Sequence, residues 1–164
     1  MNLKEQPVLS VRNLTVRYGE GCPHCQESLE KNRCPHCGSV WAANNLSLDV
    51  FPGEVLGIVG ESGSGKSTLM QSLYFDLTPT QGAAYLQMYK NGQQSIWEAS
   101  AAEKRQIKNT MMGMVYQNPI RGLRMDYSAA CNIAVKIIAP GSRNAGQMRP
   151  REKEALQARD ILTF

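Results

Sequence analysis

Residues 60–68 read Gly60-Glu61-Ser62-Gly63-Ser64-Gly65-Lys66-Ser67-Thr68, and they follow directly on the apolar stretch Val55-Leu56-Gly57-Ile58-Val59. This is the pattern G-x-x-x-x-G-K-[ST] of a phosphate-binding loop between a buried strand and a helix. Such a loop points several backbone N–H groups at one spot, and the positive end of the helix dipole lies behind them. The stretch therefore predicts an α/β fold of the P-loop NTPase class that binds the phosphates of a nucleoside triphosphate.

The residues of the loop have different parts in this prediction. Its glycines permit the tight turn and the close approach of the backbone to phosphate. Lys66 is expected to reach the β- and γ-phosphates, and the hydroxyl of Ser67 to complete the shell of a magnesium ion. Thr68 is expected beside the α-phosphate.

Length and composition limit the class of protein. A chain of 164 residues can bury one sizeable core, but a complete P-loop NTPase domain usually has more sheet than this sequence predicts. The opening residues 1–7 lack the apolar centre of a secretory signal, and no apolar stretch is long enough to span a bilayer. We therefore expect a cytoplasmic location.

The net charge of +4 is unevenly distributed along the chain. Residues 1–103 hold 7 basic and 10 acidic side chains, whereas residues 104–164 hold 11 and 4. The basic half is a candidate surface for an acidic partner, but an ordinary solvated face rich in arginine is the favoured interpretation. A nucleic-acid role rests only on this half and on the cysteine segment, and it is not favoured.

Apolar periodicity predicts the order of the elements. Strands are expected at residues 8–18, 46–50, 55–59, 85–89 and 113–117. Helices are expected at residues 68–77, 100–108, 128–138 and 150–162, and Ser100 with Glu103 predicts a capping box at the second of them. Residues 19–43 have no apolar periodicity, so we interpret them as an insert at the tip of the hairpin that the first two strands form.

The insert contains two C-x-x-C pairs, Cys22 with Cys25 and Cys34 with Cys37. Two such turns aim four sulfurs at one point, which favours a tetrahedral thiolate site for zinc. The second pair has the form typical of a zinc ribbon, although the spacer between the pairs is shorter than usual. An iron–sulfur cluster and disulfides are the less favoured alternatives.

Other residues of the metal-ligand type are interpreted more simply. His24 and His36 lie inside the cysteine pairs and are expected to be exposed bystanders. Cys131 is expected to be a small core residue on a helix. The favoured role of the metal is to fold an insert that is too small to hold a core, and the sharper alternative is a docking knob or a metal or redox sensor beside the nucleotide.

Three features together resemble the nucleotide-binding domain of ABC-type ATPases: the hairpin with its insert, the phosphate loop and the run Val115-Tyr116-Gln117-Asn118-Pro119. The resemblance covers nearly the whole chain outside the cysteine insert. It implies that Tyr18 stacks on adenine, since an aromatic ring suits that role. It also implies that Gln117 is the Q-loop glutamine, which touches the region of magnesium and the attacking water.

A later run resembles one branch of that family. Leu123-Arg124-Met125-Asp126-Tyr127-Ser128-Ala129 with Asn132-Ile133 is similar to the ATP-binding proteins of phosphonate carbon–phosphorus lyase systems. This resemblance implies a soluble phosphonate-cleaving complex as the partner rather than a membrane permease. The cysteine insert departs from the simplest form of the branch, so its role is not implied.

Two other functions stay open. The first is an ATPase subunit of a peptide or nickel importer, whose partner is a membrane permease; these relatives usually have Leu-Asn-Pro after the Q-loop, where this chain has Gly122-Leu123-Arg124-Met125. The second is a zinc-ribbon interaction module with a vestigial nucleotide site.

The resemblance also implies parts that this sequence does not contain. ABC-type hydrolysis needs a second ATPase domain in a dimer, a signature loop, a Walker B strand that ends in Asp-Glu, and a switch histidine. None of these motifs occurs before Phe164. We therefore expect the chain to be the front part of a longer ATPase, with no catalytic residue of its own and no ATP turnover alone.

Overall fold

The computed structural model describes residues 6–26, 29–118, 120, 122–129, 131, 132 and 135. The chain divides into two units, Met1–Lys104 and Arg105–Phe164, and each is described by itself. The first unit carries the described sheet, the cysteine insert and the phosphate loop. None of the helices in the described part of the chain combines the length and the apolar composition that crossing a bilayer requires.

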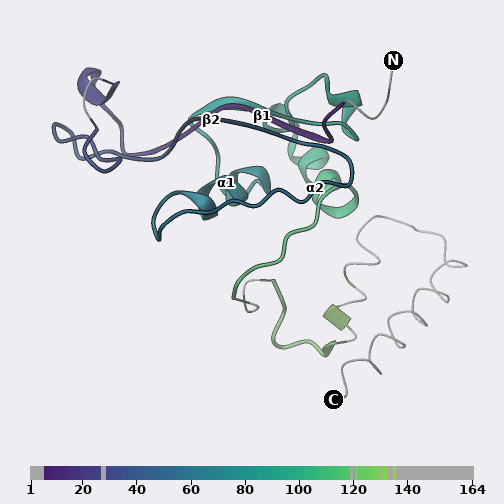
Figure 1. The fold of residues 1–164 in the computed structure, drawn as a ribbon. Helices are drawn as coiled ribbons and strands as arrows, with labels where there is room; N and C mark the ends of the chain where they lie inside the picture. Colours follow the sequence, from purple (N-terminus) through teal and green to yellow (C-terminus); the bar gives the residue numbers. More distant parts are fainter. Residues whose placement is uncertain are drawn as a thin grey trace, which may run out of the picture. The chain divides into compact units, whose positions relative to one another are not determined.

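A three-stranded antiparallel sheet forms the frame of the first unit. Strand β1 (Leu9–Tyr18) lies at its centre, between β2 (Val40–Val50) and β3 (Gln81–Leu86). Figure 1 shows β1 and β2 running side by side. The pairing of β1 with β2 confirms the predicted hairpin. Strand β2 begins at Val40, so the last four residues of the range 19–43 belong to the strand.

The remaining described elements are short. They are α1 (Lys66–Leu73), α2 (Ala101–Thr110) and the 3₁₀ helices η1 (Pro23–Gln26), η2 (Lys90–Gly92) and η3 (Ile96–Glu98). Helix α1 ends four residues before the predicted position, because Phe75 adopts a left-handed backbone with φ 60°. Strand β3 begins four residues earlier than predicted, where Gly82 with φ 108° allows it to approach the backbone of β1 closely.

The hairpin of β1 and β2 has a bulge at residues 12 and 13, where two polar residues interrupt the apolar alternation of the sequence. Asn13 and Asn45 face each other with φ of 52° and 53°, and the side-chain amide of Asn13 donates to Asn45 Oδ1 at 2.6 Å. Asparagine tolerates this left-handed backbone better than most residues. The register between β1 and β2 shifts here: β1 has one more residue than β2 between the pairs Val11–Leu48 and Leu14–Leu46. The bulge accommodates this extra residue.

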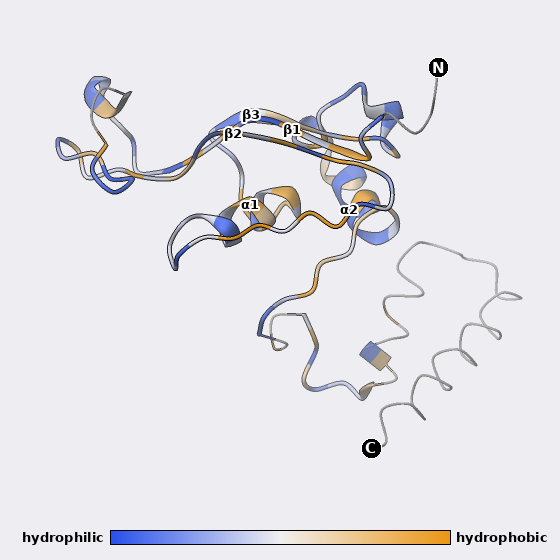
Figure 2. Ribbon diagram, in the orientation of Figure 1, coloured by the Kyte–Doolittle hydropathy of each residue, from blue (hydrophilic) through white to orange (hydrophobic). Residues whose placement is uncertain are grey.

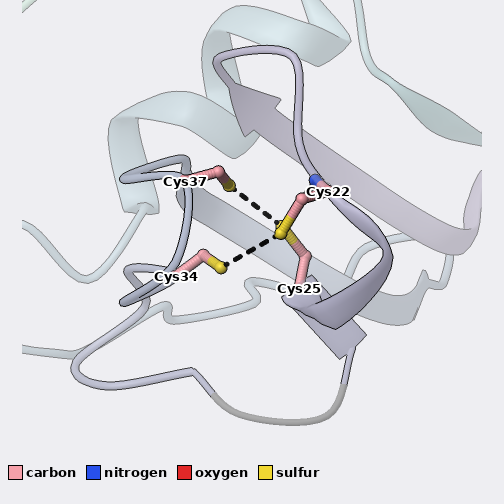
Figure 3. Close-up of side chains that lie close together, drawn as sticks. All are labelled: Cys22, Cys25, Cys34 and Cys37. Atoms are coloured by element: carbon pink, nitrogen blue, oxygen red, sulfur yellow. Dashed lines mark hydrogen bonds between the residues drawn. The ribbon is translucent and has the colours of Figure 1, made fainter.

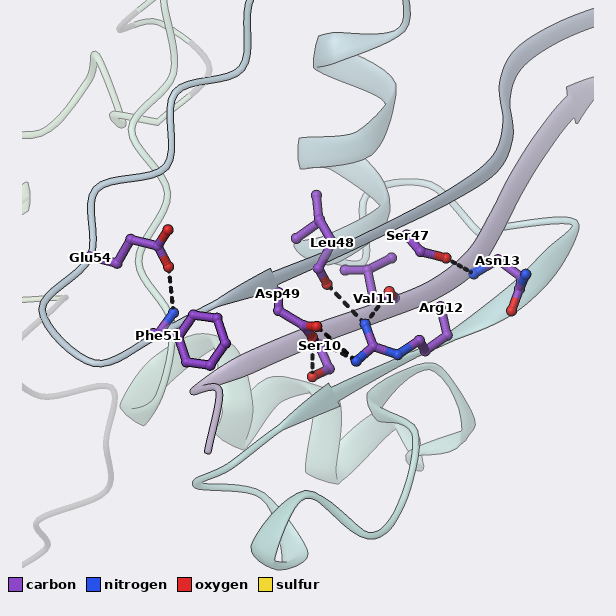
Figure 4. Close-up of polar contacts among 9 residues, drawn as sticks. All are labelled: Ser10, Val11, Arg12, Asn13, Ser47, Leu48, Asp49, Phe51 and Glu54. Carbon is purple, nitrogen blue, oxygen red and sulfur yellow. Dashed lines mark hydrogen bonds and ion pairs between the residues drawn. The ribbon is translucent and has the colours of Figure 1, made fainter. Parts of the chain in front are cut away.

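A cluster of polar side chains joins β1 and β2 near the end of the hairpin where Leu9 pairs with Val50 (Figure 4). Asp49 accepts a hydrogen bond from the Ser10 hydroxyl at 2.6 Å and forms an ion pair with Arg12 at 2.7 Å. These two donors, Ser10 first and Arg12 second, hold the pKa of Asp49 below its ordinary value. The cluster joins β1 to β2 on the solvent side and leaves the opposite face for the core.

The core of the first unit lies between the sheet and α1. Its members are apolar side chains that are almost fully buried: Val11, Leu14, Val16, Leu69, Leu73, Ala84, Leu86 and Ile96. Leu69 and Leu73 lie one turn apart on α1 and therefore share the face that packs on the sheet. This packing fixes the start of α1, and with it the end of the phosphate loop, relative to β2.

Two strand predictions are wrong for the described structure. Residues 55–59 have no regular secondary structure and pair with no described strand, and Val55 and Val59 are 96% and 94% exposed. Figure 2 shows this segment, which leads into α1, as hydrophobic. Residues 113–117 also lack strand pairing, and Val115 is 97% exposed. A strand needs a neighbour for its N–H and C=O groups, and the described sheet consists of β2, β1 and β3 and includes neither segment.

The predicted capping box is confirmed at α2. The Ser100 N–H donates to Glu103 Oε2 at 2.9 Å, and the Glu103 N–H donates to Ser100 Oγ at 3.3 Å. Glu103 also forms an ion pair with Lys90 at 3.0 Å. Most of the two later predicted helices, at residues 128–138 and 150–162, lies outside the described residues.

We expect Glu103→Gln to destabilise the protein at neutral pH but not in acid. The Ser100 backbone N–H, then Lys90 and the Ser100 hydroxyl, lower the pKa of Glu103 to about 2. A lowered folded-state pKa means that the carboxylate stabilises the fold above its ordinary pKa of 4.5, and that this contribution is lost as the pH falls toward 2. Urea unfolding should give a lower midpoint for Glu103→Gln than for the parent protein at neutral pH, and this difference should shrink as the pH falls from 4.5 toward 2. A difference that does not change with pH would contradict the assignment.

Candidate functional site

The phosphate loop turns tightly against the first strands and enters α1. Gly63 and Gly65 have φ of 83° and 91°, and Gly65 is the N-cap of α1. A Cβ atom at Gly65 would lie 1.9 Å from the carbonyl oxygen of Ala42 on β2. The loop therefore presses its backbone on β2 at a distance that only glycine permits.

Lys66 folds back over the loop that precedes it. Its Nζ donates to the carbonyl oxygens of Gly60 and Glu61, each at 2.7 Å, and lies 3.2 Å from Ser64 Oγ. The ammonium group is thus held at the centre of the turn by neutral acceptors. Phosphate oxygens carry negative charge and bond an ammonium group more strongly than carbonyl oxygens do, so a phosphate is a better partner for the same group.

A pocket of about 340 Å³ opens between the loop and the start of β2. It is lined from three parts of the first unit: the loop and α1 (Ile58, Val59, Ser64, Gly65, Lys66 and Leu69), β2 (Trp41, Ala42, Ala43, Asn44 and Leu46) and the insert (Asn32). The pocket is large enough for part of a nucleotide beside the phosphate position.

The other residues expected at a nucleotide site occupy different places. Ser67 and Thr68 form the first turn of α1, next to Lys66. Tyr18 is the last residue of β1, pairs with Val40 and is 47% exposed, so its ring is open to a stacking partner. Gln117 is exposed and belongs to the second unit. The structure thus brings together the loop, Ser67 and Thr68.

The four cysteines of the insert converge on one point (Figure 3). Their Sγ atoms all lie within 4.8 Å of one another, and neighbouring sulfurs are 3.4 to 3.7 Å apart. Zinc–sulfur bonds of about 2.3 Å in a tetrahedron place the sulfurs about 3.8 Å apart, so the spacing suits a single zinc ion. These separations are longer than the S–S bond of about 2.05 Å, so the structure shows four free cysteines in the cluster rather than the disulfides of the alternative.

Local hydrogen bonds shape the two cysteine turns. The Cys25 N–H donates to Cys22 O at 3.1 Å, and the Gly38 N–H donates to Cys34 O at 2.9 Å, which closes each turn. Hydrogen bonds from Ser39 lower the pKa of Cys37 to about 6, whereas burial raises that of Cys22 to about 12. A cation at the centre would favour the thiolate form of all four.

The remaining histidine and cysteine side chains stay outside this centre. The ring centres of His24 and His36 lie 4.9 Å apart with the rings tilted by 40°, and the group that could hold one ion contains only cysteines among the described residues. Cys131 is exposed, so its expected place in a core is wrong. The helical segment there turns the amide of Asn132, not Cys131, toward the preceding loop, where it donates to Arg124 O at 2.9 Å.

Sequence reasoning missed Trp41. This side chain is 8% exposed and packs against Cys25 and Cys34, which are 1% exposed each, with Cys22 and Leu29 at the margin. Its position a few residues after the second cysteine pair, next to a returning strand, was the available signal. The insert therefore has a small core that consists of its sulfurs and one indole ring.

The fold and the phosphate loop define a P-loop nucleotide-binding protein. Residues 43–162 match the family model described as ABC transporter, and the chain belongs to this family. It is 38% identical over 156 residues to the phosphonates utilization ATP-binding protein PhnK of Escherichia coli, a match that covers 95% of this chain and 52% of PhnK. It is 34% identical over 115 residues to an ABC transporter ATP-binding protein of Methanosarcina acetivorans, across 70% of this chain and 16% of that protein.

Solved structures agree with this assignment. The dimeric ATP-binding cassette MJ0796, in a post-hydrolysis state bound to ADP and Pi, matches with a TM-score of 0.65 and 25% identity over 91% of this chain and 56% of that one. The cbiO1 protein of Clostridium perfringens, part of the ABC transporter complex cbiONQ, has the same fold, with a TM-score of 0.61 and 23% identity over 93% of this chain and 50% of that one. The chain spans about half the length of the relatives PhnK, MJ0796 and cbiO1.

Proposed function

We propose that this chain is the nucleotide-binding part of an ABC-type ATPase of a phosphonate utilisation system. The observation that carries the proposal is the 38% identity to PhnK along 95% of the chain, which includes an intact phosphate loop. The partners that this function requires are a second ABC-type ATPase domain and a soluble carbon–phosphorus lyase complex.

In this proposal each site residue has a defined task. Tyr18 stacks on the adenine ring, and the backbone of residues 60–68 surrounds the phosphates. Lys66 exchanges its two carbonyl acceptors for β- and γ-phosphate oxygens. Ser67 and Gln117 provide oxygens for magnesium, which neutralises phosphate charge when it is bound. The four cysteines hold zinc and thereby fold the insert.

We expect Lys66→Ala to weaken the binding of magnesium ATP by roughly 10- to 100-fold. A hydrogen bond to a charged group contributes about 1.5–3 kcal/mol, and about 1.4 kcal/mol corresponds to a factor of ten. Calorimetry on the purified chain measures this affinity directly. Lys104→Ala removes the same charge outside the loop, 5.8 Å from the Phe75 ring, and should leave it unchanged. Equal affinities of the parent chain and Lys66→Ala would contradict the assignment.

The second candidate is an importer ATPase, and the similarity to the ABC transporter ATP-binding protein of Methanosarcina acetivorans favours it. The two candidates differ in the partner. Fractionation of the natural full-length protein separates them, because an importer subunit stays with membranes through its permease, whereas the phosphonate role predicts a soluble complex.

A further inference from the structure

Trp41 belongs to two sites at once. One part of its ring packs against Cys25 and Cys34 in the core of the insert. The same residue lines the pocket beside the phosphate loop, together with Gly65 and Lys66. A structural change in the cysteine core can therefore alter the nucleotide pocket through a single side chain, that of Trp41.

The backbone around Trp41 connects the same two sites. The Trp41 N–H donates to the carbonyl oxygen of Asn32 at 2.7 Å, which ties the start of β2 to the segment between the cysteine pairs. The next residue, Ala42, carries the carbonyl oxygen on which Gly65 closes. Asn32 itself lines the pocket. A continuous series of contacts thus leads from the sulfurs to the phosphate loop.

The indole N–H of Trp41 is buried and has no acceptor among the described residues. A buried donor without a partner costs about 1–3 kcal/mol, so an acceptor at this position stabilises the site. The centre of the ring lies 5.7 Å from the guanidinium carbon of Arg17, which precedes Tyr18. Trp41 therefore contacts a cation as well as the cysteine core, and its buried donor is unused among the described residues.

The insert cannot hold this arrangement by hydrophobic packing alone. Its core consists of Cys25, Cys34 and Trp41, with Cys22 and Leu29 partly buried. A core of this size is too small to fold a loop unless a bound metal joins the ligands. Without the metal, Trp41 loses the sulfurs as a packing surface, and the wall that it provides to the pocket loosens.

We infer that Trp41 makes the cysteine insert one wall of the nucleotide pocket, so that a zinc-type ion on the four thiolates strengthens binding of a nucleoside di- or triphosphate. This inference rests on the proposed function of the phosphate loop. Because binding free energies are coupled in both directions, the nucleotide also strengthens the binding of the metal. The insert acts as a metal-dependent control of the site rather than as a spacer.

The test uses the two tryptophans of the chain. Trp97→Phe leaves Trp41 as the sole fluorophore, and Trp97 lines a different pocket, where it donates to Ser72 O at 2.9 Å. ADP and magnesium ATP are titrated into this variant, with zinc and after chelation, by fluorescence and calorimetry. We expect the fluorescence emission of Trp41 to change on binding of zinc and on binding of nucleotide. We also expect zinc to lower the dissociation constant of the nucleotide about 10-fold, which corresponds to about 1.4 kcal/mol.

A second variant covers the case in which the chelated chain unfolds. Trp41→Phe keeps the four cysteines and should retain zinc, but it removes the indole from the pocket wall. We expect about 5-fold weaker nucleotide binding than in the matched variant Trp97→Phe. Unchanged affinity in Trp41→Phe, or equal affinities with and without zinc in a chain that circular dichroism shows to be folded, would overturn the inference.

The same titrations separate this inference from the proposed function. Nucleotide binding that depends on Lys66 but not on zinc refutes only the role of the insert. A zinc-loaded chain that binds no nucleotide, with or without Lys66→Ala, refutes both.

Discussion

Gly65→Ala is expected to eliminate measurable nucleotide binding and to destabilise the first unit by about 3 kcal/mol or more. Two costs add at this residue. A left-handed backbone costs about 1–2 kcal/mol for a residue with a Cβ, and forcing an extra carbon into a packed site costs about 1–3 kcal/mol. The new Cβ would lie 1.9 Å from the Ala42 carbonyl oxygen, so either the loop or β2 must move. Urea unfolding and calorimetry with magnesium ATP measure both effects.

Two other glycines of the same segment are matched controls. Gly57 has ordinary φ and Gly63 has φ of 83°, and an added Cβ meets nothing within 4 Å at either position. In the unfolding experiment Gly57→Ala should be close to neutral, and Gly63→Ala should show the backbone cost alone. If Gly65→Ala were no worse than Gly63→Ala, the contact with β2 would not matter for stability.

Cys25→Ser is expected to reduce zinc affinity by roughly 100- to 1,000-fold. Structural zinc sites with four ligands bind with about 10–16 kcal/mol, so a quarter of this is about 2.5–4 kcal/mol. Cys25 is 1% exposed, and its Sγ lies 3.4 Å from that of Cys37, within the cluster. Elemental analysis after gel filtration should find about one zinc per parent chain and little in the variant, and amide exchange in the insert should accelerate.

Cys131→Ser is the matched control, because Cys131 is exposed and lies in the second unit. It should retain zinc at the level of the parent chain. A parent chain that takes up no zinc in its reduced form, or a Cys25→Ser variant that binds it equally well, would refute the metal centre.

The sequence was sufficient where a local pattern determines the structure. The turn of the loop into α1 and the Ser100–Glu103 box depend on neighbours in the chain, and the structure shows both. The pairing of β1 with β2, predicted from the alternation within each strand, is also confirmed. The four cysteines were also identified as one group, because each C-x-x-C turn fixes two sulfurs. In each of these short motifs, residues close together in the sequence determine the local backbone conformation.

Predictions that depend on distant partners were less successful. Residues 55–59 have the composition of a buried strand, but only a neighbouring strand makes them one. Trp41 was missed because its importance comes from packing against Cys25 and Cys34, and its place after the second cysteine pair is only a weak signal of that contact. Cys131 is exposed while its neighbour Asn132 donates to Arg124 O, and an apolar pattern does not show which of two adjacent residues faces the protein.

The pairing of Tyr18 with Val40 determines how the cysteine segment is attached to the sheet. The two ends of the cysteine segment meet across one rung of the hairpin, so an ordinary tight turn closes the same gap. The cysteine segment is therefore joined to the sheet at a single residue pair, and its length places no demand on the pairing of β1 with β2 further along the hairpin. Trp41 follows that pair directly and links the segment to the pocket beside the phosphate loop.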